Sequence, residues 1–348
     1  MCALDTILAP QALDRLRLLL EGVRHIGIFC HARPDGDAIG SSLALSNILT
    51  AQGYIVMCVA PNLAPEHVIW PAGHDRLYTY EVEGFDVRAF LPTCDLFFFL
   101  DLNNLQRLDE SLMSLVESLP QPRVMIDHHP YPANDFDLLF SMPEASSTCE
   151  LLTELVLRFW GQEVITPRVA TPLYMGLMTD TGSFSYSCSR GRTFEIAGLL
   201  VDHGVDVAEV QERVYNSRSL ESLMLQSFLL LRKTNFFVNG RVALIKLSQS
   251  VQNEYNYQPG DSEGLVNLPL SIAGVEISIL LSERANGTVR ISVRSTRAHT
   301  INGLMTRYFN GGGHPQASGG TLRLPMYQAI NFTQEIFERF LTSSETGL

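Results

Sequence analysis

The chain has 348 residues, of which 46% are hydrophobic and 18% are charged, a composition typical of a folded globular protein rather than a disordered one. Its net charge of −12 argues against broad electrostatic binding to long nucleic acid. No apolar run approaches the ~20 residues of a membrane helix and the start lacks a secretory signal pattern, so we expect a cytoplasmic protein without membrane contacts.

The first half of the chain alternates between apolar runs and helical segments. Four runs predict β-strands, at residues 25–30, 54–61, 94–101 and 123–127, and a helix is expected through 38–53. Continuous apolar strands separated by helices are typical of a parallel sheet that is covered on both faces. We therefore expect an α/β domain over residues 1–190, with ligands bound beyond the carboxyl ends of its strands.

The second half of the chain contains two regions of different predicted secondary structure. Four segments between residues 145 and 232 have helical periodicity, with glycine stops, and we assign 191–233 to a helical connector. Beyond residue 234 two Asn-Gly pairs, each between apolar runs, indicate two β-hairpins. A glycine-rich loop, another strand and an amphipathic helix follow, so residues 234–348 are expected to form a smaller α+β domain.

The first chemical motif is "HARPDGDAIGSS", residues 31–42, which follows a predicted strand and opens a helix. His31, Asp35 and Asp37 lie in this loop, where Pro34 and Gly36 are expected to fix a tight turn. Imidazole and carboxylate ligands suit Mn²⁺ or Mg²⁺, and no thiolate is in position to favour zinc. The alternative is a surface turn in which Asp37 caps the helix, a role that could coexist with metal binding.

Three further acidic or histidine motifs follow. Asp101 closes an apolar strand, where an unpaired carboxylate is costly. Asp127, His128 and His129 end the strand at 123–127, and an extended backbone would point the two histidines to opposite sides. Asp180, near the end of an apolar helix, opposes the helix dipole, which suggests that another interaction, such as a metal, holds it. The alternatives are a solvated strand end, structural histidines and a polar helix end.

An arginine-rich segment lies in the second half. No Asp or Glu occurs from residue 284 to residue 334, and six arginines lie there: Arg284, Arg290, Arg294, Arg297, Arg307 and Arg323. Guanidinium groups make forked contacts with phosphate, and the consecutive glycines of "NGGGHPQASGG" allow backbone N–H groups to approach an anion closely. This combination indicates a local anion site, to which Arg294, Arg297 and His314 could add charge.

Taken in order, these motifs resemble those of the DHH/DHHA1 phosphoesterase family. "HARPDGDAIGSS", the acid at 101, "IDHH" and "GLMTDTGSF" occur in the family's order, and "GGGHPQASGG" is similar to the glycine-rich signature of its DHHA1 domain. The match spans most of the chain. The closest resemblance is to short, stand-alone members, the nanoRNA-degrading oligoribonucleases that also dephosphorylate 3′-phosphoadenosine 5′-phosphate (pAp).

The resemblance implies two divalent cations, usually Mn²⁺, with Mg²⁺ as an alternative. One would be held by His31, Asp35 and Asp101, and the other by Asp37, Asp101, His128 and Asp180, so that Asp101 bridges them. Asp127 would orient the ligands, and His129 would face substrate. The residues implied in substrate binding are Arg294, Ser295, Arg297, Gly311, Gly312, Gly313 and His314. Arg107 is a further candidate for substrate binding, from its position shortly after Asp101 rather than from the resemblance.

The resemblance further implies hydrolysis by metal-activated water, without a serine or cysteine nucleophile. The substrates would be short single-stranded RNA or DNA oligonucleotides and a mononucleotide bisphosphate, and a homodimer is left open. The alternatives are a soluble phosphodiesterase for cyclic-di-AMP or for linear dinucleotides, a single-strand exonuclease, and a catalytically inactive nucleotide-binding module.

Overall fold

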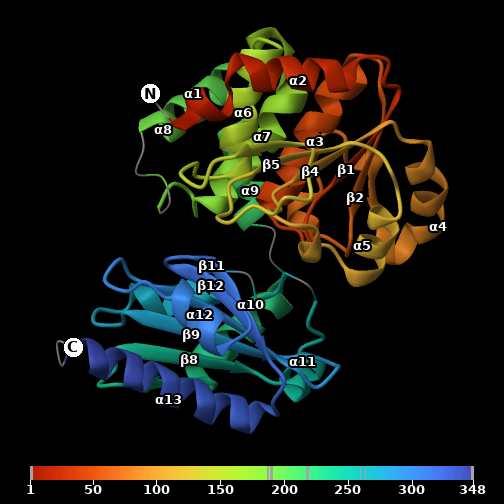
Figure 1. Cartoon of the computed structure of the whole chain (residues 1–348). Coiled ribbons are helices and arrows are strands. Elements are labelled where there is room, and N and C mark those ends of the chain that lie inside the picture. Colours follow the sequence, from red (N-terminus) through yellow and green to blue (C-terminus); the bar gives the residue numbers. More distant parts are fainter. Residues whose placement is uncertain are drawn as a thin grey trace. The chain divides into compact units, whose positions relative to one another are not determined.

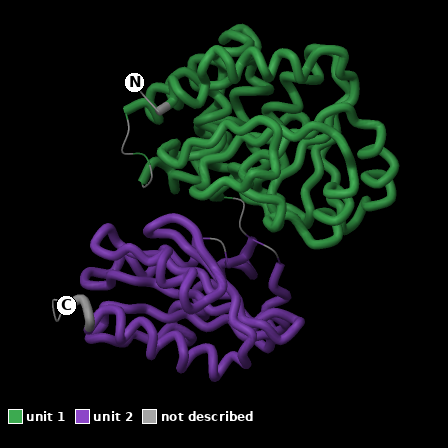
Figure 2. The backbone as a smooth tube through the Cα atoms, in the orientation of Figure 1, with its two compact units in different colours: residues 1–217 green, residues 218–348 purple. Residues whose placement is uncertain are grey.

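The chain folds into two compact units, which are residues 1–217 (unit 1) and 218–348 (unit 2) in the computed structural model (Figure 2). The structure describes residues 3–185, 188, 191–216, 219–258, 260–262 and 264–345. The segment expected as a connector, 191–233, is divided between the units. Helices α8 (Gly191–Asp202) and α9 (Val207–Tyr215) lie in unit 1, and α10 (Leu220–Arg232) lies in unit 2.

Unit 1 is built on a six-stranded sheet in the order β3-β2-β1-β4-β5-β6, with every neighbouring pair parallel (Figure 1). The strands are β1 (His25–Phe29), β2 (Ile55–Ala60), β3 (Leu77–Thr79), β4 (Leu96–Leu100), β5 (Arg123–Asp127) and β6 (Leu138–Ser141). The parallel α/β prediction is confirmed. The two strands that it missed, β3 and β6, are short edge strands of three and four residues, too short for a periodic signal.

Helices cover both faces of this sheet. They are α1 (Ala3–Ile7), α2 (Pro10–Leu20), α3 (Gly36–Ala51), α4 (Tyr80–Phe90), α5 (Glu110–Glu117), α6 (Thr148–Phe159) and α7 (Pro167–Asp180). Strand β4 is apolar along its whole length because both of its faces are buried. Phe98 packs into a core shared with α3, α6 and α7, while Phe97 and Phe99 pack into a core with α4 and α5. No described helix is long and apolar enough to cross a membrane.

Close contact between α3 and α7 depends on glycine. A Cβ added at Gly36 would lie 2.2 Å from Thr179 Oγ1, and one at Gly40 would lie 2.4 Å from the Pro172 carbonyl oxygen. Gly36 is therefore required by the neighbouring helix, and it is the first residue of α3, with a φ outside the left-handed region. The contact brings the start of α3 beside the end of α7.

Unit 2 contains a six-stranded sheet in the order β11-β12-β10-β9-β8-β7. The strands are β7 (Thr234–Phe237), β8 (Val242–Leu247), β9 (Ile277–Glu283), β10 (Val289–Ser295), β11 (Gly312–His314) and β12 (Ala317–Leu322), and the helices after α10 are α11 (Gln249–Glu254), α12 (Asn302–Tyr308) and α13 (Met326–Glu345). Both expected Asn-Gly hairpins are confirmed, as the antiparallel pairs β7–β8 and β9–β10. Helices α12 and α13 pack on one face of the sheet.

The glycine-rich stretch is a hairpin of two strands, β11 and β12, and not the expected loop. Two of its glycines are required by packing inside unit 2. A Cβ added at Gly311 would lie 1.9 Å from the Gly319 carbonyl oxygen, and one at Gly320 would lie 2.4 Å from that of Phe309. These contacts let the chain turn directly from α12 into the sheet.

Candidate metal centre

The six residues predicted as metal ligands meet at one edge of the unit 1 sheet. Three of them follow strands: His31 comes after β1, Asp101 after β4 and His128 after β5. Because these strands are parallel neighbours, their carboxyl ends share an edge. The other three come from the start of α3 and the end of α7, which are Asp35, Asp37 and Asp180.

Asp101 lies between two groups of potential ligands. His31, Asp35 and Asp101 form one group, and Asp37, Asp101 and His128 form the other, with ligand atoms within 4.8 Å of one another in each. One oxygen of Asp101, Oδ2, lies 3.2 Å from His31 Nε2, while Oδ1 lies 3.6 Å from His128 Nε2. Asp180 joins the second group, because its Oδ2 lies 3.5 Å from His128 Nε2.

Backbone carbonyl groups orient the two histidines. His31 Nδ1 lies 3.0 Å from the carbonyl oxygen of Ala32, and His128 Nδ1 lies 3.2 Å from that of Ala145. A carbonyl oxygen accepts only from an N–H, so each Nδ1 carries a proton and each Nε2 is the ring nitrogen that faces the carboxylates. This is the arrangement in which a histidine ligates a metal.

Asp101 itself has an unusual backbone conformation. Its φ is +58°, in the left-handed region that residues other than glycine rarely adopt. Its N–H donates to the carbonyl oxygen of Ile126 on the neighbouring strand, over 3.1 Å. The turn directs the buried Asp101 carboxylate between the two ligand groups, and such strain is common at functional sites.

The two acids at the start of α3 have different roles. Asp35 caps α3, because its Oδ1 accepts from the N–H groups of Asp37 and Ala38, over 3.1 and 3.2 Å. Asp37 accepts instead from the first N–H groups of α6, those of Thr148 (2.7 Å) and Cys149 (2.9 Å). The alternative that Asp37 caps its own helix is therefore wrong, and the N-terminus of α6 holds its carboxylate in place.

Sequence reasoning missed the contribution of "SSTCE", residues 146–150. Ser147 caps α6, and the Thr148 hydroxyl donates to Asp101 Oδ1 over 3.0 Å. Thr148 is fully buried and contacts ligands from both groups. A Ser followed three residues later by Glu150 was a detectable signal for a helix start, but nothing in it indicated which carboxylates the helix would meet.

His128 and His129 were expected to point to opposite sides of a strand, but they do not. Strand β5 ends at Asp127, so the alternation of side chains stops before the histidines. Both rings face Asp101: His129 Nδ1 lies 3.4 Å from its Oδ1, and the two ring centroids are 4.8 Å apart. Asp127 fixes His129, by accepting from its N–H over 2.9 Å and by lying 2.8 Å from its Nδ1.

The electrostatics of the centre favour a bound cation. Burial, followed by repulsion from Asp101 and Asp180, raises the pKa of the Asp37 carboxyl well above its usual range. Burial lowers the pKa of the His31 imidazole, but hydrogen bonds with Asp101 and Asp35 outweigh it and raise the pKa to about 10. Four carboxylates and two imidazoles at close range match the oxygen and nitrogen ligands of Mn²⁺ and Mg²⁺, and a divalent cation would offset the repulsion between the acids.

Arg107 lies beside the centre, after β4. Its carbonyl oxygen accepts from the Ala32 N–H over 2.7 Å, and its charge acts on the pKa values of His31 and His129. Its Nη1 is buried and has no hydrogen-bond partner in the part of the chain that the structure describes. A buried guanidinium N–H without a partner is costly, so Arg107 can still take an anionic ligand.

The predicted substrate residues of unit 2 lie on two different faces of its sheet. Arg294 is opposite Ala317, which is opposite His314, so these side chains share one face. Gly312 lies on the same face, where a Cβ would have no neighbour nearer than 4.0 Å.

Four other predicted substrate residues have different surroundings. Ser295 lies on the opposite face and donates to the His299 carbonyl oxygen, Arg297 follows the strand and is exposed, and Gly311 and Gly313 approach neighbouring backbone.

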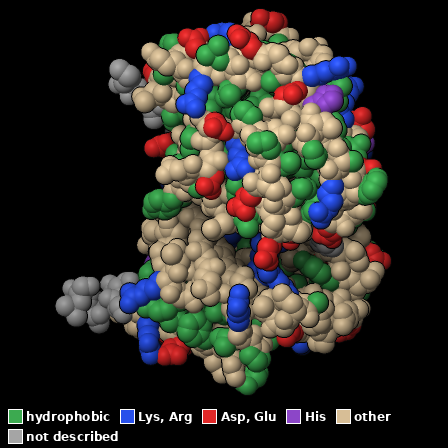
Figure 3. Space-filling view, turned by 45° about the vertical axis from the view of Figure 1, so that its right-hand side comes forward, with side chains coloured by type: hydrophobic (Ala, Val, Ile, Leu, Met, Phe, Trp, Pro, Cys, Tyr) green, Lys and Arg blue, Asp and Glu red, His purple; other side chains and the backbone are tan. Residues whose placement is uncertain are grey.

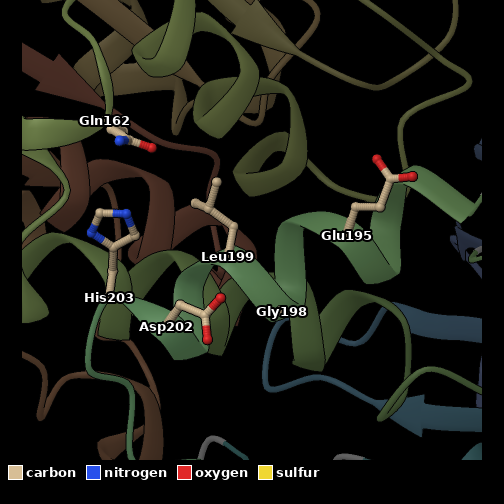
Figure 4. Close-up of a pocket in the computed structure, with 6 residues that line it drawn as sticks. All are labelled: Gln162, Glu195, Gly198, Leu199, Asp202 and His203. Atoms are coloured by element: carbon tan, nitrogen blue, oxygen red, sulfur yellow. The ribbon is translucent and has the colours of Figure 1, made fainter.

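A surface hollow of about 450 Å³ on α8 contains none of the predicted site residues (Figure 4). It is lined by Gln162, Glu195, Gly198, Leu199, Asp202 and His203. Glu195 is exposed and already pairs with Arg192 over 2.9 Å. The predicted chemistry of unit 1 is therefore concentrated at the strand ends rather than in this hollow.

Comparison with protein families matches both units. The model of the DHH family N-terminal domain matches residues 25–177, which include five of the six predicted metal ligands. The model of the DHHA1 domain matches residues 239–343, which include the arginine-rich segment.

Individual relatives match over nearly the whole chain. A probable bifunctional oligoribonuclease and PAP phosphatase NrnA of Streptococcus mutans is 28% identical, over 92% of this chain and 93% of that protein. The bifunctional oligoribonuclease and PAP phosphatase NrnA of Thermus thermophilus is 29% identical, over 96% of each. Among solved structures, an exopolyphosphatase-related protein from Bacteroides fragilis is 34% identical with a TM-score of 0.88, over 95% of this chain and 97% of that one.

Proposed function

The chain belongs to the DHH family and carries a DHHA1 domain, and on that premise we propose that it is a metal-dependent phosphoesterase for short oligonucleotides and pAp. Relatives that match it nearly end to end are named as oligoribonucleases and PAP phosphatases. We further propose that the centre takes two divalent cations and that Mn²⁺ is the working ion.

The position of Asp101 is the observation that carries this proposal. Each of its oxygens faces a different group, at 3.2 Å from His31 Nε2 and at 3.6 Å from His128 Nε2. A carboxylate shared in this way is what two neighbouring cations require. When bound, the ions would supply a hydroxide from water and stabilise the charge on the phosphate oxygens.

The chain's own residues prepare the reaction around this centre. The amides of α6 hold Asp37, and the Thr148 hydroxyl holds Asp101, so the carboxylates need no reorganisation when substrate arrives. Nδ1 of His129 is committed to Asp127, which leaves Nε2 as the atom that contacts substrate or exchanges a proton with it. The buried Nη1 of Arg107 is placed to bind a phosphate oxygen.

Unit 2 is proposed to bind the part of the substrate that is not cut. Arg294, Gly312 and His314 lie on one face of its sheet, in a segment without acids. Their charge and the open backbone at Gly312 favour a phosphate or the nucleotide that carries it.

The overall charge supports short substrates rather than long ones. The net charge is −12, and in Figure 3 acidic and basic side chains are interspersed over unit 1. A long polyanion would gain little from such a surface, because binding to nucleic acid depends largely on phosphate neutralisation.

A panel of substrates tests this function. Purified protein is assayed with pAp, a dinucleotide, a longer RNA and cyclic-di-AMP, with and without Mn²⁺. We expect Mn²⁺-stimulated hydrolysis of pAp and the dinucleotide, and slow turnover of the other two.

The matched variants are Asp101→Asn and, as a control, Asp86→Asn at an exposed position of α4. Asp101→Asn keeps the side-chain size and is expected to lower kcat at least ~100-fold, since metal catalysis contributes several kcal/mol. Preference for cyclic-di-AMP would support a cyclic-dinucleotide phosphodiesterase instead, and no Mn²⁺-dependent cleavage of any nucleotide would contradict the enzyme proposal.

A further inference from the structure

Strand β10 presents a row of polar side chains on the face of the unit 2 sheet opposite α12 and α13, a face that α10 and residues 265–266 cover on its β8–β9 side. Val289, Ile291 and Val293 alternate into the core with those helices. The residues between them therefore project from the opposite face, and they are Arg290, Ser292 and Arg294. The first is exposed and the other two are half-buried, so a ligand can reach the row.

Two strands on one side of β10, β12 and β11, carry little side-chain volume on this face. On the β12 side, Gly319 lies opposite Ser292 and Gly312 lies opposite Gly319, so there is almost no side-chain bulk there, whereas on the β9 side the buried Leu280 lies opposite Ser292. Arg290 lies between two hydroxyl residues, Ser282 on β9 and Thr321 on β12. These hydroxyls are hydrogen-bond donors of the kind that accompany arginine in phosphate sites.

Arg290 and Arg294 are well separated along the strand. The two residues are four positions apart, which corresponds to about 13 Å on an extended strand. A phosphate bound at Arg294 thus leaves room for a separate anion at Arg290.

A second arginine, Arg284, lies near Arg290. Arg284 follows β9, where its carbonyl oxygen and N–H bond to Gly287 and Thr288 in the turn that leads to β10. Burial and repulsion from the nearby Arg290 lower the pKa of the Arg284 guanidinium.

Neither arginine is neutralised within the described ranges. No carboxylate or other hydrogen-bond partner holds either guanidinium there, whereas Arg241 in the same unit pairs with Glu276 over 2.9 Å. Two adjacent positive charges without an acid repel each other, and a bound anion would relieve that repulsion.

We propose that Arg284 and Arg290, with Ser282 and Thr321, form a second phosphate-binding position on the face of the unit 2 sheet opposite α12 and α13, which takes the third phosphate of a 5′-phosphorylated trinucleotide. The inference rests on the proposed function. It concerns the oligonucleotide substrates rather than pAp, because pAp has two phosphates and the trinucleotide has three. Oligonucleotides with three or more phosphates gain a contact that pAp does not make.

The test compares binding of pAp and of the trinucleotide pApApA to the full chain in EDTA, where neither is hydrolysed. Arg290→Ala and Arg284→Ala are expected to weaken binding of pApApA about tenfold, because each removes a charge-assisted hydrogen-bond donor. The salt dependence of log K for pApApA should fall by about 0.7 for one lost phosphate contact. Arg290→Lys should retain most of the salt dependence, and pAp should change less than about twofold in all variants.

Arg339→Ala is the matched control, since Arg339 is an exposed arginine of α13, on the covered side of the sheet, and already pairs with Glu335. The proposal is overturned if pApApA binds the alanine variants as tightly as the wild type, or if pAp weakens as much as pApApA. An absence of hydrolysis in Mn²⁺ would count against the proposed function alone, because the ratio of the two affinities in EDTA would still decide the second phosphate position.

Discussion

Thr148→Val tests whether the start of α6 prepares the metal centre. Valine keeps the β-branched shape of threonine and the backbone N–H that donates to Asp37, but it removes the hydroxyl that donates to Asp101 over 3.0 Å. The hydroxyl is fully buried, so water cannot replace it without repacking.

The expected magnitude follows from this contact. A hydrogen bond to a charged group contributes about 1.5–3 kcal/mol, and 1.36 kcal/mol corresponds to a factor of ten. Affinity for Mn²⁺ should therefore fall about 10- to 100-fold, which is the range found when groups that orient metal ligands are removed. The variant should remain folded, because the core around it keeps its volume.

The assay is the Mn²⁺ concentration that gives half-maximal hydrolysis of pAp, together with calorimetric Mn²⁺ binding and thermal unfolding. Thr153→Val is the matched control: it removes a buried hydroxyl one turn later on α6, where the acceptor is the carbonyl oxygen of Cys149 instead of a carboxylate. The reasoning is refuted if Thr148→Val binds Mn²⁺ like the wild type, or if Thr153→Val loses as much affinity.

Two other predictions concern unit 2. Gly311→Ala should lower the melting temperature, since its Cβ would meet the Gly319 carbonyl oxygen at 1.9 Å. Gly312→Val should leave the melting temperature unchanged and raise KM for pAp. Equal melting temperatures of the two variants would contradict the packing of Gly311 against Gly319. Hydrogen bonds from Arg241 and His299 lower the pKa of Glu276, so its stabilising effect is present above the usual carboxyl range and is lost as pH falls through the lowered pKa. The free energy of unfolding, measured with denaturant, should fall less steeply from pH 7 to pH 3 for Glu276→Gln than for the wild type. Parallel curves for the two proteins would count against this ion pair.

The positions of the predicted ligands followed from a simple topological rule. An acid or a histidine placed just after each of several apolar strands must reach one edge if the strands are parallel neighbours. His31, Asp101 and His128 satisfy that condition, and the structure brings them together as expected. A local sequence pattern was sufficient to predict these three ligands, because each of them directly follows the strand that positions it.

Other features depend on contacts between distant segments. The bond from Thr148 to Asp37 joins residues 111 positions apart, so no local pattern indicates it. The direction of His129 was mispredicted because strand alternation was extended past the end of β5. Gly36 was assigned to a turn, although the residue that requires it is Thr179 on α7, which only the folded packing reveals.

The number of Mn²⁺ ions bound per chain tests the proposed centre most directly, because two cations are proposed to share Asp101. Equilibrium dialysis with metal analysis should give two ions for the wild type, one for His31→Ala, which alters a single group, and neither at high affinity for Asp101→Asn. A single ion on the wild type, or two ions retained by Asp101→Asn, would contradict the shared centre.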